Sequence, residues 1–199
     1  LEVGYKNRQA TPSEMERMRG HVENSMKEGA MGIGSSLIYA PGDYASTEEL
    51  TELSKVASEY GGMYISHLRS EGTNLLEALE ELISISRNAS IPAEVYHLKA
   101  SREPNWSKLD DVIKRIEEVR KEGLKITADI YTYNASSTGL TGVIPTWVQE
   151  GGHRAWIQRM KDPEVRPRLL ADIREQLDEQ PPEGILLVGF KTSKMSRKY

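Results

Sequence analysis

The feature that most constrains the fold is a helix–strand alternation that repeats about every thirty residues. Short apolar segments begin near residues 31, 63, 94 and 125, and each follows a stretch with helical patterning. Repeats of this length are typical of βα units, whose strands lie parallel in one sheet. Four such strands form either an open doubly wound sheet or half of an eight-stranded barrel. The pattern therefore predicts an α/β fold with about four parallel βα units.

Capping sequences and glycines mark the ends of the four predicted helices. Two segments, 11–14 and 46–49, have the capping-box pattern of a helix start. Gly29, Gly61 and Gly123 stand where glycine commonly ends a helix. Apolar residues at helical spacing predict the buried faces of the third and fourth helices: Leu75, Leu79, Leu82 and Ile83, then Leu109, Ile113, Ile116 and Val119.

The regular alternation ends near Ser136. A turn-rich stretch and helical segments around 152–160 and 163–176 follow, then a Pro-rich linker at 180–184. The apolar segment 184–190 predicts a strand, and the polar, basic residues 191–199 predict a frayed end. We expect residues 1–135 to hold the βα units. Residues 136–199 should form a small, mostly helical subdomain with a truncated return strand, inserted into the βα array or appended to it.

Composition narrows the class of partner. The formal net charge is −4 and no basic cluster stands out, so we expect neither nucleic acid nor an anionic membrane as partner. No apolar run is long enough to cross a bilayer. The absence of cysteine excludes disulfides and leaves the compartment open, with the cytoplasm favoured over the periplasm.

Candidate functional residues follow from the geometry of parallel sheets. Reacting groups lie at the carboxyl ends of the strands and in the loops that follow them. This rule selects, strand by strand, Ser35, Ser36 and Tyr39; His67, Arg69 and Glu71; His97 and Lys99; and Asp129, Tyr131 and Tyr133.

Two of the four histidines stand at equivalent strand ends. His67 and His97 lie thirty residues apart, which is one βα unit. Since neighbouring strands are about 4.8 Å apart, the two imidazoles can converge on one metal ion, and neutral imidazole is a common zinc ligand. The alternative is that both are structural, hydrogen-bonded residues. His21 and His153 lie on predicted helices and receive no site role, while Asp129 is a base, a ligand or a cap.

The same strand ends carry a resemblance to a known family. The segments 32–42 (GIGSSLIYAPG), 66–71 (SHLRSE), 96–100 (YHLKA), 105–106 (NW) and 128–140 (ADIYTYNASSTGL) resemble, in order and spacing, motifs of the D-aminoacylase branch of the amidohydrolase superfamily, the N-acyl-D-amino-acid deacylases. The resemblance implies a partial (β/α)₈ TIM-like barrel. It also implies one or two zinc ions and hydrolysis of N-acyl-D-amino acids to a carboxylate and a D-amino acid.

The resemblance also assigns roles to individual residues. His67 and His97 match the histidines that hold the tightly bound zinc. Tyr39, Lys99 and Tyr131 match positions that grip the substrate, with Tyr133 as the alternative to Tyr131. The helical stretch after Ser136 resembles the small insertion that covers the active site.

Departures from the family pattern limit what this chain can do by itself. The chain has no His-x-His motif and no cysteine, and the catalytic aspartate and the arginine for the substrate carboxylate are expected outside it. The chain is thus expected to be a central piece of the barrel that is inactive alone, binds zinc weakly or not at all, and self-associates. Two alternatives stay open: a non-metal barrel enzyme of the isomerase or aldolase type that uses Lys99 and Asp129, and a non-catalytic α/β binding domain with structural histidines.

Overall fold

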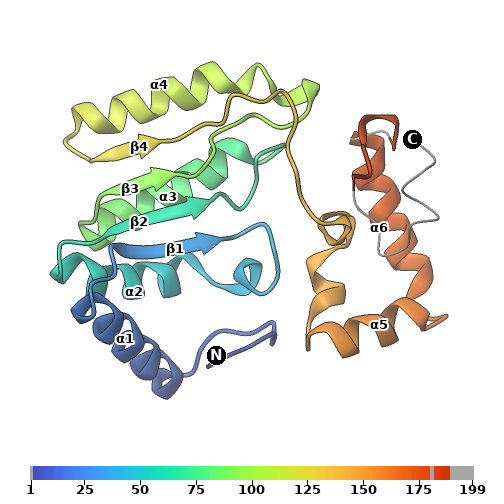
Figure 1. Cartoon of the computed structure of the whole chain (residues 1–199), viewed down its shortest axis with the longest axis horizontal. Coiled ribbons are helices and arrows are strands. Elements are labelled where there is room, and N and C mark those ends of the chain that lie inside the picture. Colours follow the sequence, from blue (N-terminus) through green and yellow to red (C-terminus); the bar gives the residue numbers. More distant parts are fainter. Residues whose placement is uncertain (1, 180–181, 189–199) are drawn as a thin grey trace.

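The computed structural model describes residues 2–179 and 182–188 and contains a four-stranded sheet covered by helices (Figure 1). Helices and strands alternate along the first two thirds of the chain, and two further helices follow. The elements are α1 (Pro12–Lys27), β1 (Gly32–Ser36), α2 (Thr47–Glu59), β2 (Met63–His67), α3 (Leu75–Ala89), β3 (Ala93–Val95), α4 (Lys108–Lys121), β4 (Ile126–Ala128), α5 (His153–Lys161) and α6 (Arg166–Glu179).

All the strand pairs are parallel, and the strand order is β1-β2-β3-β4. Ser36 pairs with His67 at the end of β2, and Val95 pairs with Ala128 between β3 and β4. An order that follows the sequence without reversal is that of consecutive barrel strands, whereas a doubly wound sheet reverses at a switch point. The predicted α/β class with parallel βα units is confirmed, and the order agrees with a partial barrel.

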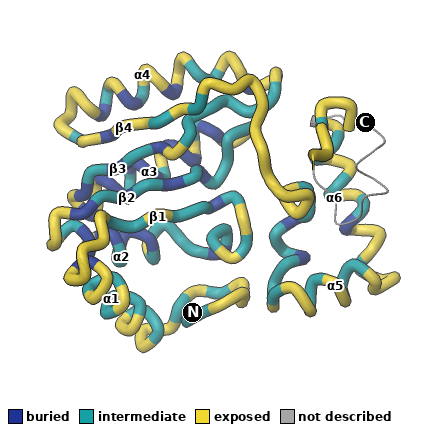
Figure 2. Tube along the Cα trace, viewed as in Figure 1, coloured by how far each residue is buried: buried dark blue, intermediate teal, exposed yellow. Residues whose placement is uncertain are grey.

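One face of the sheet packs on the helices and forms the core. Tyr64 and Ser66 of β2 and Ala93 and Val95 of β3 are all buried on this side. The predicted apolar face of α3 is confirmed, because the four residues named for it are each at most 1% exposed. Figure 2 shows the buried positions gathered on the central strands and on the helix turns that face them.

The buried face of α4 differs from the prediction at Ile113, and Leu109 is only half-buried. Ile116 and Val119 are buried as expected, but Ile113 is 44% exposed and Val112 is buried in its place. The reason is the position of α4 at the side of the layer, where it contacts α3 and β4. Its other flank, which carries Ile113, is open to solvent.

The opposite face of the sheet carries the side chains that alternate with the core set. Because successive side chains of a strand point to opposite faces, Ile65 and His67 of β2 point away from Tyr64 and Ser66. Glu94, the register partner of Ile65, lies on this second face, where its carboxylate accepts a hydrogen bond from Thr127 at 2.8 Å. The strand pattern alone therefore directs His67 away from the helix layer.

Local sequence signals explain where α1 and β1 begin. Thr11 and Glu14 form the complete predicted capping box, with the Thr11 amide donating to the Glu14 carboxylate at 2.8 Å. At Gly32 a Cβ would lie 1.9 Å from the carbonyl oxygen of Met63, and φ is +152°. Only glycine fits this approach of β1 to β2, so close backbone packing accounts for Gly32, whereas a Cβ at Gly34 would make an ordinary contact with the Ile65 side chain at 3.6 Å.

The helical character of the last part of the chain is confirmed, but the predicted strand is not. The segments predicted as helical correspond to α5 and α6. Pro182–Gly184 form a 3-10 turn, residues 185–188 have no regular structure, and Leu186 and Val188 are 76% and 82% exposed. An apolar run forms a strand only where a sheet edge pairs with it, and this run pairs with no strand of the described chain. Residues 189–190 and the predicted frayed end lie outside the described residues.

Hydrogen bonds join this last part to the βα units. The Tyr44 hydroxyl donates to the carbonyl of Thr146 at 2.6 Å, and the Gly151 amide donates to the carbonyl of Tyr5 at 2.8 Å. Figure 1 shows α5 and α6 beside the carboxyl ends of the strands. Among the helices of the described ranges, none has the length and apolar content needed to span a membrane.

Candidate metal centre

His67 is the last residue of β2, and its backbone is held on the side of β1. Its carbonyl accepts hydrogen bonds from the Leu37 amide and from the Ser66 hydroxyl, both at 3.0 Å. The Ser66 hydroxyl also accepts from Ser35 at 2.9 Å, and Ser35 lies 2.7 Å from the hydroxyl of buried Tyr64. A buried chain of hydroxyl groups thus fixes the strand end from which the imidazole projects.

His97 follows β3 in an unusual backbone conformation. Its φ is +42°, in the left-handed region that non-glycine residues seldom adopt. Its amide donates to the carboxylate of Asp129. The Asp129 amide donates to the Val95 carbonyl at 3.1 Å, and the Asp129 carbonyl accepts the Leu98 amide at 2.8 Å. The Asp129 carboxylate thus caps a backbone amide of the loop after β3. This carboxylate holds His97 in a strained conformation of the kind that clusters at functional sites.

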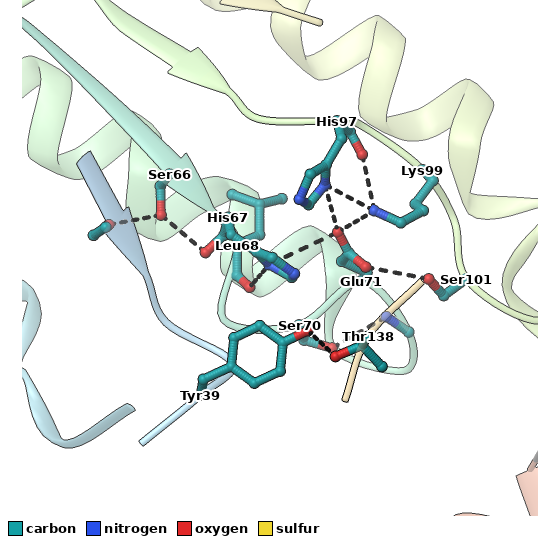
Figure 3. Close-up of polar contacts among 12 residues, drawn as sticks. Tyr39, Ser66, His67, Leu68, Ser70, Glu71, His97, Lys99, Ser101 and Thr138 are labelled. Atoms are coloured by element: carbon teal, nitrogen blue, oxygen red, sulfur yellow. Dashed lines mark hydrogen bonds and ion pairs between the residues drawn. The ribbon is translucent and has the colours of Figure 1, made fainter. Parts of the chain in front are cut away.

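The two imidazoles meet at the carboxyl ends of their adjacent strands (Figure 3). Their ring centroids are 4.4 Å apart with an interplanar angle of 89°. Glu71 lies beside both, with its Oε1 3.1 Å from His97 Nδ1 and 3.8 Å from His67 Nδ1. One ligand atom from each of the three residues lies within 4.8 Å of the other two. Two imidazoles and a carboxylate at this separation suit zinc.

The electrostatics of His67 agree with this arrangement. Burial lowers the pKa of the His67 imidazole below its usual value, although the Glu71 carboxylate acts in the opposite direction. The ring is therefore neutral at ordinary pH, and a neutral ring has a nitrogen lone pair for a metal.

Lys99 completes the cluster. Its ammonium donates to Glu71 Oε1 at 2.5 Å, contacts His97 Nδ1 at 2.8 Å and donates to the carbonyl of His97 at 3.0 Å. Ser101 contacts the other carboxylate oxygen of Glu71 at 3.4 Å. A positive group therefore stands next to the two imidazoles, where it can meet an anionic ligand.

The tyrosines differ in how closely they approach the histidines. The Tyr39 ring lies 5.4 Å from that of His67, edge to face, and its hydroxyl is 2.9 Å from that of Thr138. The Tyr131 ring lies 6.2 Å from the His97 ring and 5.4 Å from the Lys99 ammonium. Tyr133 is 79% exposed. Of these two candidates for a substrate-binding tyrosine, the geometry therefore favours Tyr131 over Tyr133.

Several other candidates lie outside this cluster. Arg69 forms a two-pronged ion pair with Glu81 at 2.8 and 2.9 Å and donates to the carbonyls of Asp43 and Ala45, so it fastens the β1–α2 loop to α3. The hydrogen bonds that the Arg69 guanidinium donates to the Glu81 carboxylate raise the pKa of Arg69. His21 on α1 lies 3.2 Å from the carboxylate of Glu2, which precedes that helix, and the His153 ring on α5 lies 5.3 Å from the Trp156 ring, so both histidines contact groups outside the cluster.

Glu71 is the residue whose importance the sequence did not reveal. The strand-end rule selects Glu71, but neither the sequence pattern nor the family resemblance gives it a role. Its position four residues after His67, on the loop that follows β2, was the available signal. Only the structure shows that this loop folds back and brings the carboxylate to His97.

The sequence of this chain is similar to those of known deacylases. No protein-family model matches the chain. A D-aminoacylase of Alcaligenes xylosoxydans xylosoxydans is 35% identical over 133 residues, which are 67% of this chain and 27% of that protein. An N-acyl-D-glutamate deacylase of the same organism is 31% identical over 65% of this chain and 27% of its own length. This chain resembles the D-aminoacylases.

Solved structures of deacylases are similar to this chain as well. An N-acyl-D-glutamate deacylase from Bordetella bronchiseptica, in complex with zinc and a phosphonate mimic of the tetrahedral intermediate, matches with a TM-score of 0.61 and 31% identity over 62% of this chain and 26% of that one. A D-aminoacylase described as defining a novel subset of amidohydrolases matches with the same TM-score and identity over 64% of this chain. This D-aminoacylase-like chain thus spans about a quarter of the length of the relatives it matches.

Proposed function

We propose that this chain provides the zinc-holding and substrate-gripping strand ends of an amidohydrolase that cleaves the amide bond of N-acyl-D-amino acids. The observation that carries the proposal is the meeting of the His67 and His97 rings, 4.4 Å apart, at the ends of adjacent parallel strands. Similarity to two deacylases, one with zinc and a tetrahedral mimic bound, supports the same chemistry.

His67 and His97 would hold the zinc ion. When bound, zinc would polarise the amide carbonyl and lower the pKa of a bound water toward about 7. The remaining ligands would come from the rest of the barrel, since this chain has no cysteine and no His-x-His motif, and the family resemblance would put the aspartate that moves the proton there as well. With Glu71 held by Lys99, His67 and His97 would be the metal's two ligands from this chain, and the zinc affinity of the chain alone would be low.

Three side chains would hold the substrate beside the metal. The Lys99 ammonium stands within hydrogen-bond distance of His97, so it can attract an anionic group of a substrate placed there. Tyr39 and Tyr131 lie on either side of the histidine pair, and their hydroxyl groups can orient the amide or stabilise developing negative charge.

Residues 136–149 would form the start of a cover over this site. The hydrogen bond between Tyr39 and Thr138 supports this role, because it ties the segment after β4 to a proposed substrate residue. We propose in addition that residues 136–199 form a subdomain inserted into the barrel, with its boundary at residue 136.

The non-metal alternative requires Lys99 and Asp129 to act together on a substrate. Asp129 instead accepts the His97 amide, and Lys99 pairs with Glu71. No observation specific to that alternative supports it.

Zinc titration followed by calorimetry tests the proposal on this chain. The histidine substitutions His67→Ala and His97→Ala should abolish the binding, whereas His21→Ala, which removes an imidazole 59% exposed on α1, should leave it unchanged. In a protein that joins this sequence to the remaining barrel strands, the same two site substitutions should abolish hydrolysis of N-acyl-D-amino acids. Zinc binding or hydrolysis that survives both substitutions would contradict the proposal.

A further inference from the structure

Asn105 and Trp106 lie outside the cluster around His67 and His97, and the two residues differ in exposure. Trp106 is 62% exposed, whereas Asn105 is only 4% exposed. Asparagine is found mostly at the surface, and burying its amide is costly unless the donor and acceptor atoms have partners. The contacts of the buried Asn105 side chain therefore show what it holds.

The Asn105 amide is hydrogen-bonded at both its nitrogen and its oxygen. Its Nδ2 donates to the Ser101 carbonyl at 2.8 Å, within the loop after β3, and its Oδ1 accepts the Lys108 ammonium at 2.7 Å. The same ammonium donates to the carbonyls of Thr73 at 2.7 Å and Gly72 at 3.4 Å, both in the loop after β2. A Cβ at Gly72 would lie 3.5 Å from Asn105 Nδ2, so the amide also packs against this loop. Asn105 and Lys108 thus form a clamp between the two loops.

These two loops begin where the pairing of β2 with β3 ends. The last register pair of the two strands is Ser66 with Val95, and His67 and His97 both lie beyond it. The distance between the two imidazoles, whose centroids are 4.4 Å apart, therefore depends on how the loops are held together. Residues that act together on one ligand must be held within about 0.5 Å of the productive geometry.

Ser101 links the clamp to the cluster. Its carbonyl accepts Asn105 Nδ2, its amide donates to the Glu71 carbonyl at 2.7 Å, and its hydroxyl contacts the Glu71 carboxylate at 3.4 Å. Figure 3 shows Ser101 beside this carboxylate, which lies 3.1 Å from His97 Nδ1. A displacement of Ser101 would therefore move a group that contacts the imidazole.

We propose that Asn105 and Lys108 are positioning residues, which clamp the loop after β2 to the loop after β3 and so hold His67 and His97 at the spacing that one metal ion requires. The inference rests on the proposed function, because the metal is the zinc ion of that site. Neither residue would touch the ion or the substrate, and both would act through the loops that carry the ligands.

Amide hydrogen exchange of the chain at micromolar concentration, followed by mass spectrometry, tests whether the clamp holds the loops. Asn105→Ala should raise the exchange rate of the Ser101 amide about 10-fold, as expected for the loss of about one hydrogen bond. The amides of the paired strands β2 and β3 should keep their wild-type rates, because the opening is local. Lys108→Met removes the ammonium at a partly buried position and should have the same effect, so it serves as the second variant if Asn105→Ala does not fold.

A matched substitution controls for the loss of an asparagine. Asn88→Ala removes an amide that donates to the Ser84 hydroxyl on the same helix, α3, and should leave exchange at Ser101 unchanged. Wild-type exchange at Ser101 in the folded clamp variants would overturn the inference. An equal rise throughout the strands would overturn it as well, since it would show a general loss of stability.

Zinc affinity gives the second readout, in a protein that joins this sequence to the remaining barrel strands. Each clamp variant should bind zinc about 10–100-fold more weakly while its circular dichroism stays that of the wild type, because lost support of metal ligands has effects of this size. Asn88→Ala should bind zinc as the wild type does. Fast exchange at Ser101 together with wild-type zinc affinity would overturn the positioning role.

The two proposals fail in distinguishable ways. If the joined protein binds zinc through His67 and His97 and the clamp variants bind it equally tightly, the inference fails and the proposed function stands. If the joined protein binds no zinc, the proposed function fails, and with it the link from the clamp to a metal, whereas selective exchange at Ser101 would still support the clamp between the loops.

Discussion

The hydrogen bond from the His97 amide to Asp129 offers the sharpest prediction on how the site is built. The amide belongs to a residue with φ of +42°, in the loop that carries the proposed ligand. A hydrogen bond to a charged group contributes about 1.5–3 kcal/mol, and a non-glycine residue in the left-handed region costs about 1–3 kcal/mol. The two values are of similar size, so the bond to Asp129 offsets the strain at His97.

Removing the acceptor should therefore both destabilise the chain and release the loop. We expect Asp129→Ala to lower the free energy of unfolding by about 2 kcal/mol. With a urea slope of about 2 kcal/mol/M, the midpoint should fall by about 1 M. Asp129→Asn keeps an oxygen acceptor without the charge and should lose about half as much.

Urea titration followed by circular dichroism measures the midpoint, and amide hydrogen exchange at His97 reports whether the loop has opened. The strain-offset reasoning is refuted if Asp129→Ala has the wild-type midpoint and the wild-type exchange rate at His97. A midpoint equal to that of the wild type with fast exchange at His97 would instead show that the loop opens locally without global unfolding.

Three further predictions concern the core, the loop anchor and the chain as a whole. Burial raises the pKa of the Tyr64 hydroxyl above its usual 10.0. Above pH 10 the unfolded chain therefore loses the hydroxyl proton more readily than the folded chain, and the free energy of unfolding falls as pH rises. Tyr64→Phe should reduce this fall in alkaline urea titrations, and the same dependence of stability on pH in both proteins would contradict the prediction. Arg69→Lys keeps the charge but loses the two-pronged fit to Glu81, and should cost about 1–2 kcal/mol in thermal or urea unfolding. The matched change Arg115→Lys, at an exposed pair with Glu80, should cost less than about 0.5 kcal/mol, and equal costs would count against the anchor role of Arg69. Because β1 and β4 are unpaired sheet edges within the described residues, sedimentation should show concentration-dependent self-association, and a monomer in dilute solution would refute this. The chain alone should also not hydrolyse N-acetyl-D-amino acids, and measurable turnover would refute that expectation.

Much of the fold could be predicted because local signals and the fold agree in the first two thirds of the chain. The helix starts at Thr11 and Ser46 have side-chain caps that the sequence displays, and the strand ends follow from the repeat length. The strand predicted at 184–190 is wrong over its described part, residues 184–188, for the opposite reason. Strand formation there depends on a distant pairing partner, and no local pattern records whether one is present.

The site was predictable to the extent that it follows from strand position. The adjacency of His67 and His97 is a consequence of one βα repeat in a parallel sheet, and the structure brings the two rings together. The roles of Glu71 and Asp129 could not be derived in this way. Both depend on how the loops after β2, β3 and β4 fold onto one another, which involves backbone conformations, such as that of His97, that the sequence does not specify.

The central claim is that His67 and His97 bind one zinc ion together. Crystals of a protein that joins this sequence to the remaining barrel strands, soaked with zinc and measured above and below the zinc absorption edge, test it most directly. The account predicts an anomalous peak about 2.0–2.1 Å from a ring nitrogen of both His67 and His97, absent in crystals of His67→Ala. A peak bound to only one of these rings, or zinc found only at other histidines such as His21 or His153, would contradict it.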